Sequence, residues 1–101
     1  MPNPLPSLEL LRVFDACARC QGFTAAAAEL GMTQPAVSQQ MQRLELELGT
    51  RLFDRVHRGI TLTAAGQALL APVQQALDLV RDAVAVVRDR PSRDMLLVAT
   101  D

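Results

Sequence analysis

Polar, uncharged side chains occupy the start of a predicted helix near the middle of the chain, and they are the residues best suited to recognition chemistry. Gln34, Ser38, Gln39 and Gln42 are spaced so that they lie off the apolar face of this helix. Glutamine can form a pair of hydrogen bonds with adenine, serine can reach several bases, and Pro35 or Ala36 can contact a thymine methyl group. The residue types and their spacing therefore predict a surface that recognises base edges in the major groove of DNA.

The elements that must position these side chains are two short helices joined by a tight turn, over residues 23–44 (FTAAAAELGMTQPAVSQQMQRL). We expect Thr24 to cap the first helix and Gly31 to end it in a left-handed conformation. Thr33 is expected to cap the second helix, and Pro35 fits in its first turn because that position has no intrahelical N–H bond to lose. This pattern is typical of a helix-turn-helix. An ordinary helical hairpin packed in a core is the alternative, and the exposed amides and hydroxyls favour DNA recognition.

A further helix is predicted before this pair and should support it. Ser7 can cap this helix, and Gly22 is expected to end it. Its buried face is expected to consist of Leu8, Leu11, Phe14 and Ala18. The second helix of the pair has an inward face of its own at spacings of four, three and four, made of Val37, Met41, Leu44 and Leu48.

A short hairpin is predicted next, because residues 51–56 and 60–63 have strand patterns on either side of a glycine-containing turn. Three helices and a hairpin make a mainly α winged helix-turn-helix. Arg55 and Arg58 would lie on or beside the wing, where arginine can contact phosphate or enter a narrow minor groove. For His57, a DNA contact and an ordinary solvated turn are equal alternatives.

A long helix is predicted from Thr63 to Arg90, and at 1.5 Å per residue it would extend about 40 Å. A small domain cannot cover such a length, so we expect the helix to pair with a second copy of itself. Pro72 removes one backbone bond and bends the helix unless local packing absorbs the change, and the helix should end before Pro91. The predicted dimer seam keeps spacings of three and four and consists of Leu70, Val73, Leu77, Val80, Val84 and Val87.

These elements divide the chain into three parts. Residues 1–63 form the predicted winged helix-turn-helix, and residues 64–91 form a linker and dimerisation helix. Residues 92–101 contain an apolar run from Met95 to Ala99, which is typical of a buried strand. We expect this last segment to begin a truncated effector domain, and a terminus without regular structure is the alternative.

The composition limits the possible functions. The chain has 101 residues and a net charge of −1, which counts weakly against a nucleic-acid partner. No stretch approaches the roughly 18 consecutive apolar residues of a membrane span, and the N-terminus lacks a signal-peptide pattern, so we expect a cytoplasmic protein with no membrane partner. All the basic residues are arginine, and four of them lie between the recognition helix and the hairpin turn: Arg43, Arg51, Arg55 and Arg58.

Cys17 and Cys20 form a C-x-x-C pair, but nothing else in the sequence completes a metal or redox site. They lie within a helical pattern, there is no second cysteine pair, and His57 is the only histidine. We therefore expect reduced thiols on or near the core, with no metal and no cofactor. An enzyme is also disfavoured, because no paired carboxylates, glycine-rich phosphate loop or thiol beside a histidine is evident.

Four segments carry a family likeness: FTAAAAELGMTQPAVSQQMQRLELELG, RLFDR, GITLTAAG and the long helix that follows. Together they resemble the N-terminal domain of LysR-type transcriptional regulators over nearly the whole chain. LLAPV and HRG look most like the branch that contains regulators of glycine-cleavage and β-lactamase genes. The resemblance implies a winged helix-turn-helix that binds an interrupted inverted repeat in double-stranded DNA as a dimer or a dimer of dimers. It also implies a longer protein, in which only a separate effector domain binds a small molecule.

The resemblance also assigns residues by position. It places the start of the recognition helix at Thr33, Gln34, Pro35, Ser38 and Gln39, with backbone or wing contacts at Arg43, Arg55 and Arg58. Many relatives carry arginine where this chain has Gln39, so an amide suited to adenine replaces a contact to guanine and a borrowed operator sequence does not apply. Glu45 is expected to pair locally. The residues expected in the core are Leu44, Leu48, Leu52 and Phe53.

A protein-interaction module is the main alternative to DNA recognition. In that case the apolar seam of the long helix would be the functional surface, and the helix-turn-helix would be only a fold. Weak, salt-insensitive DNA binding would favour this alternative, because phosphate contacts make specific binding depend on salt.

Overall fold

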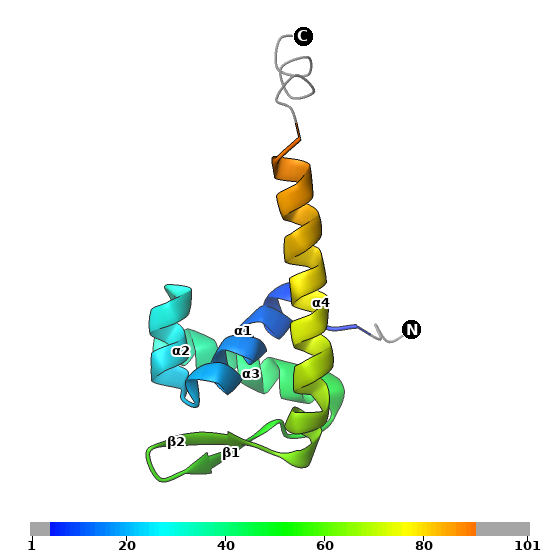
Figure 1. Cartoon of the computed structure of the whole chain (residues 1–101). Helices are drawn as coiled ribbons and strands as arrows, with labels where there is room; N and C mark the ends of the chain where they lie inside the picture. The colour runs from blue at the N-terminus through cyan, green and yellow to red at the C-terminus, as the bar shows by residue number, and fades with distance from the viewer. Residues whose placement is uncertain (1–4, 91–101) are drawn as a thin grey trace.

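Three helices pack around one core, a two-stranded hairpin lies beside them, and a fourth helix extends away from the domain (Figure 1). This computed structural model describes residues 5–90. The order of elements confirms the predicted winged helix-turn-helix. The elements are α1 (Leu8–Cys20), α2 (Phe23–Leu30), α3 (Gln34–Leu48), β1 (Phe53–Val56), β2 (Gly59–Leu62) and α4 (Ala64–Arg88).

Helix α1 begins as predicted and ends differently. The Ser7 hydroxyl oxygen accepts a hydrogen bond from the Leu10 N–H at 3.1 Å, which caps the first turn. At the other end the cap is Gln21, whose φ of 58° is left-handed, and Gly22 has extended backbone. The prediction that Gly22 ends α1 is therefore wrong. Gly22 instead precedes the first residue of α2.

Helix α2 begins two residues earlier than predicted. Phe23 is its first residue, and Gly22 at the cap position makes no side-chain hydrogen bond. The prediction that Thr24 caps this helix is therefore wrong, because Thr24 already lies within its first turn. Phe23 packs edge-on against Phe53, with ring centroids 5.8 Å apart, and this contact places Phe23 in the helix.

The turn between α2 and α3 follows the prediction. Gly31 has a φ of 69° and ends α2, and its N–H donates to the Ala27 carbonyl. The Thr33 hydroxyl oxygen accepts from the Ala36 N–H at 3.2 Å, so Thr33 caps α3. Pro35 lies in the first turn of α3, where its missing N–H costs no intrahelical bond.

The core lies where α1, α2 and α3 meet the hairpin. Phe14, Val37, Met41, Leu44 and Leu52 are at most 1% exposed, as expected for the inward faces. Leu11 and Ala18 are half-buried, and Phe53 and Ala26 complete the centre of the core. Two predicted core residues are not buried, because each lies in a terminal turn that its neighbours no longer cover: Leu8 at 48% and Leu48 at 37% exposed.

The wing is an antiparallel hairpin in which Phe53 pairs with Leu62 and Val56 pairs with Gly59. It is attached to the end of α1, where the Ile60 N–H donates to the Gln21 carbonyl at 3.4 Å. Gly59 is required at this approach, because a Cβ there would lie 2.6 Å from the Gln21 oxygen. The wing therefore has a defined position relative to α1.

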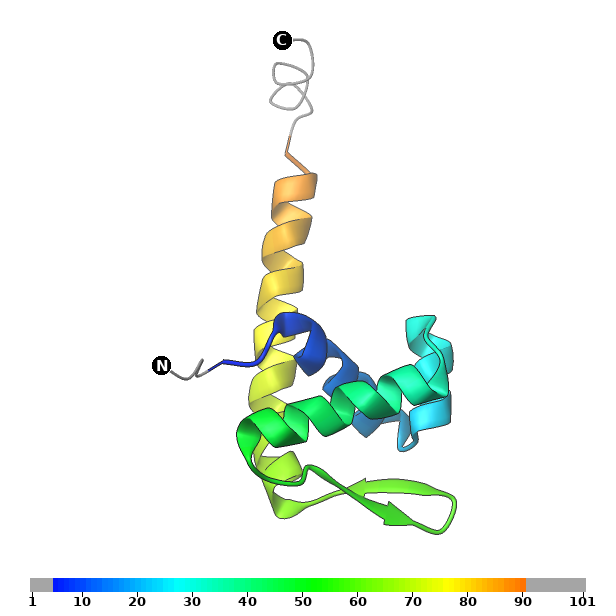
Figure 2. The ribbon, with the colours of Figure 1, turned by 180° about the vertical axis from the view of Figure 1, so that it is seen from behind.

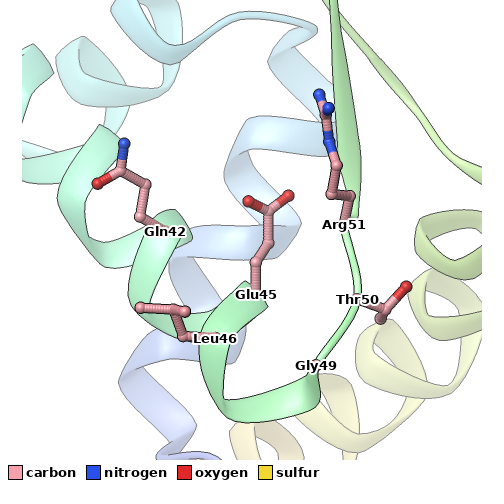
Figure 3. Close-up of a pocket in the computed structure, with 6 residues that line it drawn as sticks. All are labelled: Gln42, Glu45, Leu46, Gly49, Thr50 and Arg51. Atoms are coloured by element: carbon pink, nitrogen blue, oxygen red, sulfur yellow. The ribbon is translucent and has the colours of Figure 1, made fainter.

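Helix α3 holds the first strand through Glu45. Its carboxylate accepts hydrogen bonds from two consecutive backbone N–H groups, Leu52 at 2.7 Å and Phe53 at 3.2 Å. Figure 3 shows Glu45 projecting from α3 toward the segment that carries Arg51. The expectation that Glu45 pairs locally is wrong, because its partners lie seven and eight residues away.

The junction between the wing and α4 is fixed by Thr63. Its hydroxyl donates to the Arg51 carbonyl at 2.7 Å and accepts from the Gly66 N–H at 3.1 Å. Its own N–H donates to the Leu52 carbonyl at 2.9 Å. A Cβ at Gly66 would lie 2.3 Å from that same carbonyl oxygen, so the first turn of α4 can approach the strand only with glycine there.

Helix α4 is covered by the domain along its first half only (Figure 2). It continues through Pro72 as one helix. Val73 and Leu77 are each 4% exposed and belong to the core, and Leu70 is half-buried against it. The assignment of Val73 and Leu77 to a dimer seam is therefore corrected, because α1 and the core already cover them. The predicted seam residues that stay accessible are Val80, Val84 and Val87, at 41%, 38% and 64%.

Two further expectations concern the end of the chain and membranes. Pro91 and the predicted strand over residues 95–99 lie outside the described residues. Within residues 5–90, no helix combines the length and the apolar character that crossing a membrane requires.

Replacing Glu45 tests how the wing is held on α3. Glu45→Ala leaves two backbone N–H groups without their acceptor, so we expect it to lower the free energy of unfolding by about 1–3 kcal/mol. Glu47→Ala on the same helix removes only an exposed ion pair and should change it by about 0.5 kcal/mol or less. Urea unfolding followed by circular dichroism measures both variants. Equal losses in the two variants would contradict the anchoring role of Glu45.

Candidate nucleic-acid interface

The predicted recognition residues all lie in the first two turns of α3 or at its cap. Gln39 is exposed and, by helical spacing, lies on the side opposite Met41 and Leu44. It can therefore reach a partner without disturbing the core. Thr33 and Pro35 are also exposed, whereas Gln34, Ala36 and Ser38 are half-buried.

One flank of α3 faces the wing across a hollow. Ser38 and Gln42 border this hollow from α3, and Arg51 and Arg55 border it from the strand side. Gln42 and Arg51 were not among the predicted site residues. The helical repeat did place Gln42 off the apolar face together with Ser38, but no DNA contact was assigned to it.

A second hollow continues along the same side, between the wing and the start of α2 and α3. Gln34 from α3 and Thr24 from α2 border it together with Arg55 and Arg58 from the wing. Thr24 was predicted only as a helix cap, and no local pattern indicated its place beside the wing. The fold therefore brings the amide and hydroxyl groups of α3 alongside the arginines of the hairpin.

The two wing arginines carry charges without acidic partners in the part of the chain that the structure describes. Arg55 lies over the Phe23 ring, with its guanidinium carbon 5.5 Å from the ring centroid. Arg58 is exposed at the hairpin turn, with a left-handed φ of 75°. Because no carboxylate of residues 5–90 pairs with either side chain, both can bind an external anion.

The other two arginines of this region are already paired. Arg43 lies 3.3 Å from Glu47, and Arg51 lies 3.5 Å from Asp54. All four side chains are largely exposed apart from Glu47, so these pairs are weak. To contact a phosphate, Arg43 would have to break its ion pair with Glu47.

His57 lies in the hairpin turn beside Arg58 and is exposed. Its position at the tip of the wing is compatible with both alternatives, a DNA contact and a solvated turn. A DNA contact by His57 therefore stays a prediction.

The thiols have no metal-binding or redox partner in the described part of the chain. Cys17 and Cys20 are both free, Cys17 is buried, and Cys20 is half-buried. Burial raises the pKa of Cys17 to about 12, which keeps it a thiol at neutral pH. No group of three or more potential ligands gathers within residues 5–90. Cys17 thus packs in the core, whereas the Cys20 Sγ donates a hydrogen bond to Glu29 Oε1 at 3.5 Å.

The sequence profile of bacterial regulatory helix-turn-helix proteins of the LysR family matches residues 8–67. Over 99 residues the chain is 40% identical to the glycine cleavage system transcriptional activator of Escherichia coli strain K12. The aligned segment covers 98% of this chain and 32% of that protein. Over 92 residues it is 41% identical to the carbapenem-hydrolysing β-lactamase transcriptional activator of Enterobacter cloacae, covering 91% of this chain and 31% of that protein. The chain thus spans about a third of the length of these curated relatives.

Solved structures show the same fold. The crystal structure of the CbnR DNA-binding domain in complex with DNA is 40% identical, with a TM-score of 0.75, covering 82% of this chain and 95% of that one. The BenM DNA-binding domain in complex with benA site 1 DNA is 35% identical, with a TM-score of 0.77, covering 82% of this chain and 93% of that one. Both neighbours were solved bound to DNA.

The predicted resemblance is confirmed, including the likeness to regulators of glycine-cleavage and β-lactamase genes. These relatives are transcriptional regulators, and the family consists of DNA-binding helix-turn-helix proteins and not of enzymes. The matched segment covers more than half of the chain, from the start of α1 to the first turn of α4. The chain therefore belongs to the LysR family of bacterial regulatory helix-turn-helix proteins.

Proposed function

We propose that this chain is the operator-binding part of a LysR-type transcriptional regulator and that it binds an interrupted inverted repeat in double-stranded DNA as a dimer. One observation carries the proposal. Gln34 and Ser38 of the recognition helix border the same hollows as the unpaired Arg55 and Arg58 of the wing. Base-reading groups and phosphate-binding groups thus share one side of the domain.

In the proposed complex α3 enters the major groove with its first turns. Gln39, which is exposed on the side opposite the core, pairs with adenine, while Gln34 and Ser38 contact neighbouring bases. Pro35 and Ala36 lie in the same turn and meet thymine methyl groups. Thr33, at the cap, contacts the backbone beside the groove entrance.

The wing and the end of α3 supply the contacts to the DNA backbone. Arg55 and Arg58 bind phosphate or enter the adjacent minor groove, and His57 accompanies them at the tip. Arg43 binds a phosphate after leaving Glu47. This local cluster explains how a chain with a net charge of −1 can bind DNA, because field strength depends on where charges lie.

The exposed half of α4 is the proposed dimer interface. Val80, Val84 and Val87 continue the apolar spacing of the buried Val73 and Leu77, yet the domain leaves them accessible. Pairing with a second α4 would cover them and place two recognition helices on one face of the duplex. Leu79 and Val86 are also exposed, at 73% and 66%, but the helical repeat places them off this seam.

Two further proposals concern assembly and effector binding in the whole regulator. We propose that dimers can assemble into tetramers and that a small-molecule effector is bound by a separate domain. We also propose that the protein acts in the bacterial cytoplasm, where the chromosome that would carry its operator lies.

Binding of the purified chain to DNA from upstream of its own coding region tests the proposal. We expect two chains per site, a clear preference over scrambled DNA, and affinity that falls steeply with salt. Val84→Asp should make the chain a monomer that binds each half-site independently and more weakly, because it charges the proposed seam. Ala85→Asp is the control, since Ala85 lies on the polar side of α4 with Asp78 and Asp82. Fluorescence anisotropy with analytical ultracentrifugation measures both quantities, and sequence-independent, salt-insensitive binding would refute the proposal in favour of a protein-interaction module.

Gln39→Ala tests base recognition. Loss of a paired amide contact should weaken binding to the matched operator by about 1–3 kcal/mol and relax the preference at one base pair. Gln40→Ala on the same helix should leave that preference intact, because Gln40 lies away from the outward face. Affinities for operators mutated one base pair at a time measure the effect. A uniform loss on every sequence would rule out base reading by Gln39.

Arg58→Ala tests the contact of the wing with the DNA backbone. We expect weaker binding to every sequence and a slope of log affinity against log salt that is about 1 unit shallower, because one phosphate contact is lost. Arg81→Ala removes an exposed arginine that pairs with Asp78 on α4, and it should keep the original slope. A salt titration of all three proteins gives the answer, and an unchanged slope for Arg58→Ala would exclude the phosphate contact.

A further inference from the structure

Asp15 is the buried carboxylate of the described residues, with only 4% of its surface exposed. Both of its oxygens have partners. Gln74 of α4 donates from Nε2 to one oxygen at 3.0 Å, and Arg19 of α1 donates from Nε to the other at 3.1 Å. Within residues 5–90, no buried side-chain nitrogen or oxygen lacks a partner. The buried charge is therefore fully satisfied, but only while α4 keeps Gln74 in place.

The same arginine extends this set of contacts to the helix-turn-helix. Arg19 binds Glu29 of α2 with both terminal nitrogens, and one of these hydrogen bonds measures 3.1 Å. Gln74, Asp15, Arg19 and Glu29 thus form a continuous polar chain from α4 through α1 to α2. Figure 1 shows the matching arrangement of helices, with α1 lying between α4 and α2.

The hydrogen bonds of this polar chain restrict the relative orientation of helices whose other contacts are apolar. Helix α2 buries only Ala26 and Ala27, and α4 meets the core mainly through Val73 and Leu77. Apolar contacts depend on area and permit small rotations, because the hydrophobic effect is non-directional. A hydrogen bond to a buried carboxylate has a narrow geometry, and losing the one from Gln74 leaves a buried oxygen of Asp15 without its partner.

The angle of α4 has a direct consequence for DNA spacing. Gln74 lies 13 residues before Val87, which is about 20 Å along the helix. A change of about 10° at Gln74 would therefore move the far end of the seam by about 3.5 Å, close to the rise of one base pair. Small errors in this angle would let a dimer accept half-sites one base pair too near or too far.

We propose that Gln74 and Asp15 are positioning residues, which hold α4 at one angle to the helix-turn-helix and thereby set the half-site spacing that a dimer accepts. The role of these residues in half-site spacing rests on the dimeric operator binding proposed above. Their role in fixing the angle of α4 does not, because that angle is a property of the free chain. Neither residue borders the hollows between α3 and the wing, so neither is expected to contact DNA.

The first measurement uses the free chain without DNA. Backbone residual dipolar couplings by NMR give the orientation of α4 relative to α1 and α2. For the unaltered chain and for the control Gln75→Leu, which changes the exposed neighbour of Gln74, we expect one alignment tensor to fit all helices. For Gln74→Leu we expect α4 to require a tensor of different orientation or reduced magnitude. An unchanged fit for Gln74→Leu would overturn the positioning role, whatever the DNA experiment gives.

The second measurement compares a single half-site with paired half-sites whose spacer is changed by one or two base pairs. All three proteins should bind the single half-site within about twofold of one another. The unaltered chain and Gln75→Leu should prefer the natural spacer at least tenfold, and Gln74→Leu less than threefold. Altered couplings with unaltered spacer preference would overturn the link to spacing. If the unaltered chain does not favour paired half-sites, dimeric operator binding and the spacing role both fail, while the couplings still decide the angle.

Glu29→Gln provides a second variant if Gln74→Leu does not fold. It alters the exposed end of the polar chain, keeps the size of the side chain, and leaves Asp15 with both partners. We expect the dipolar couplings of α2 to fit the common alignment tensor less well than in the unaltered protein. We expect the preference for the natural spacer to be weaker than that of the unaltered protein but still above threefold. If the dipolar couplings and the spacer preference equal those of the unaltered protein, the polar contacts do not position α2, and that part of the proposal is overturned.

Discussion

The contacts of Phe53 join the wing to α1 and α2, the two helices against which α3 packs. The chain has three phenylalanines and neither tyrosine nor tryptophan, and two of the rings contact that of the third, Phe53. The Phe53 ring lies 5.5 Å from that of Phe14 and 5.8 Å from that of Phe23, measured between centroids. Because these residues belong to β1, α1 and α2, the two contacts tie the wing to the helices, and each contributes about 0.5–1.5 kcal/mol beyond its buried area. Arg55 then stacks over Phe23 on the outer side, so the core also orients a side chain of the proposed interface.

Backbone hydrogen bonds from side chains give the wing its exact course around this cluster. Glu45 holds the start of β1 on α3, and Thr63 joins the end of β2 to the first turn of α4. Two glycines, Gly59 and Gly66, allow backbone approaches that a Cβ would prevent. As a result, the exposed amides of α3 and the unpaired arginines of the hairpin face the same side. That shared side, rather than the overall charge, is what suits the domain to a polyanion.

Helix α4 serves two purposes along its length. Its first half completes the core of the domain through Val73 and Leu77, and its second half leaves Val80, Val84 and Val87 accessible. The apolar spacing is continuous through both halves, which is why it resembles a single coiled-coil seam. The division matters physically, because the buried half fixes the direction in which the exposed half leaves the domain. Any pairing of two chains would inherit that direction.

The sequence by itself determined the local features of this protein. Helix caps at Ser7 and Thr33 and the left-handed Gly31 depend on neighbouring residues, so they were predicted correctly, as were the order of elements and the burial of Val37, Met41 and Leu44 on α3. The predicted Gln and Ser side chains do lie on the surface of α3, though their contacts with DNA stay a prediction. Only the tertiary structure decided that Phe23 begins α2, that Glu45 binds the backbone of β1, and that half of the α4 seam is used within the domain. Those outcomes depend on which distant segments approach one another, and periodicity along a single helix carries no information about that.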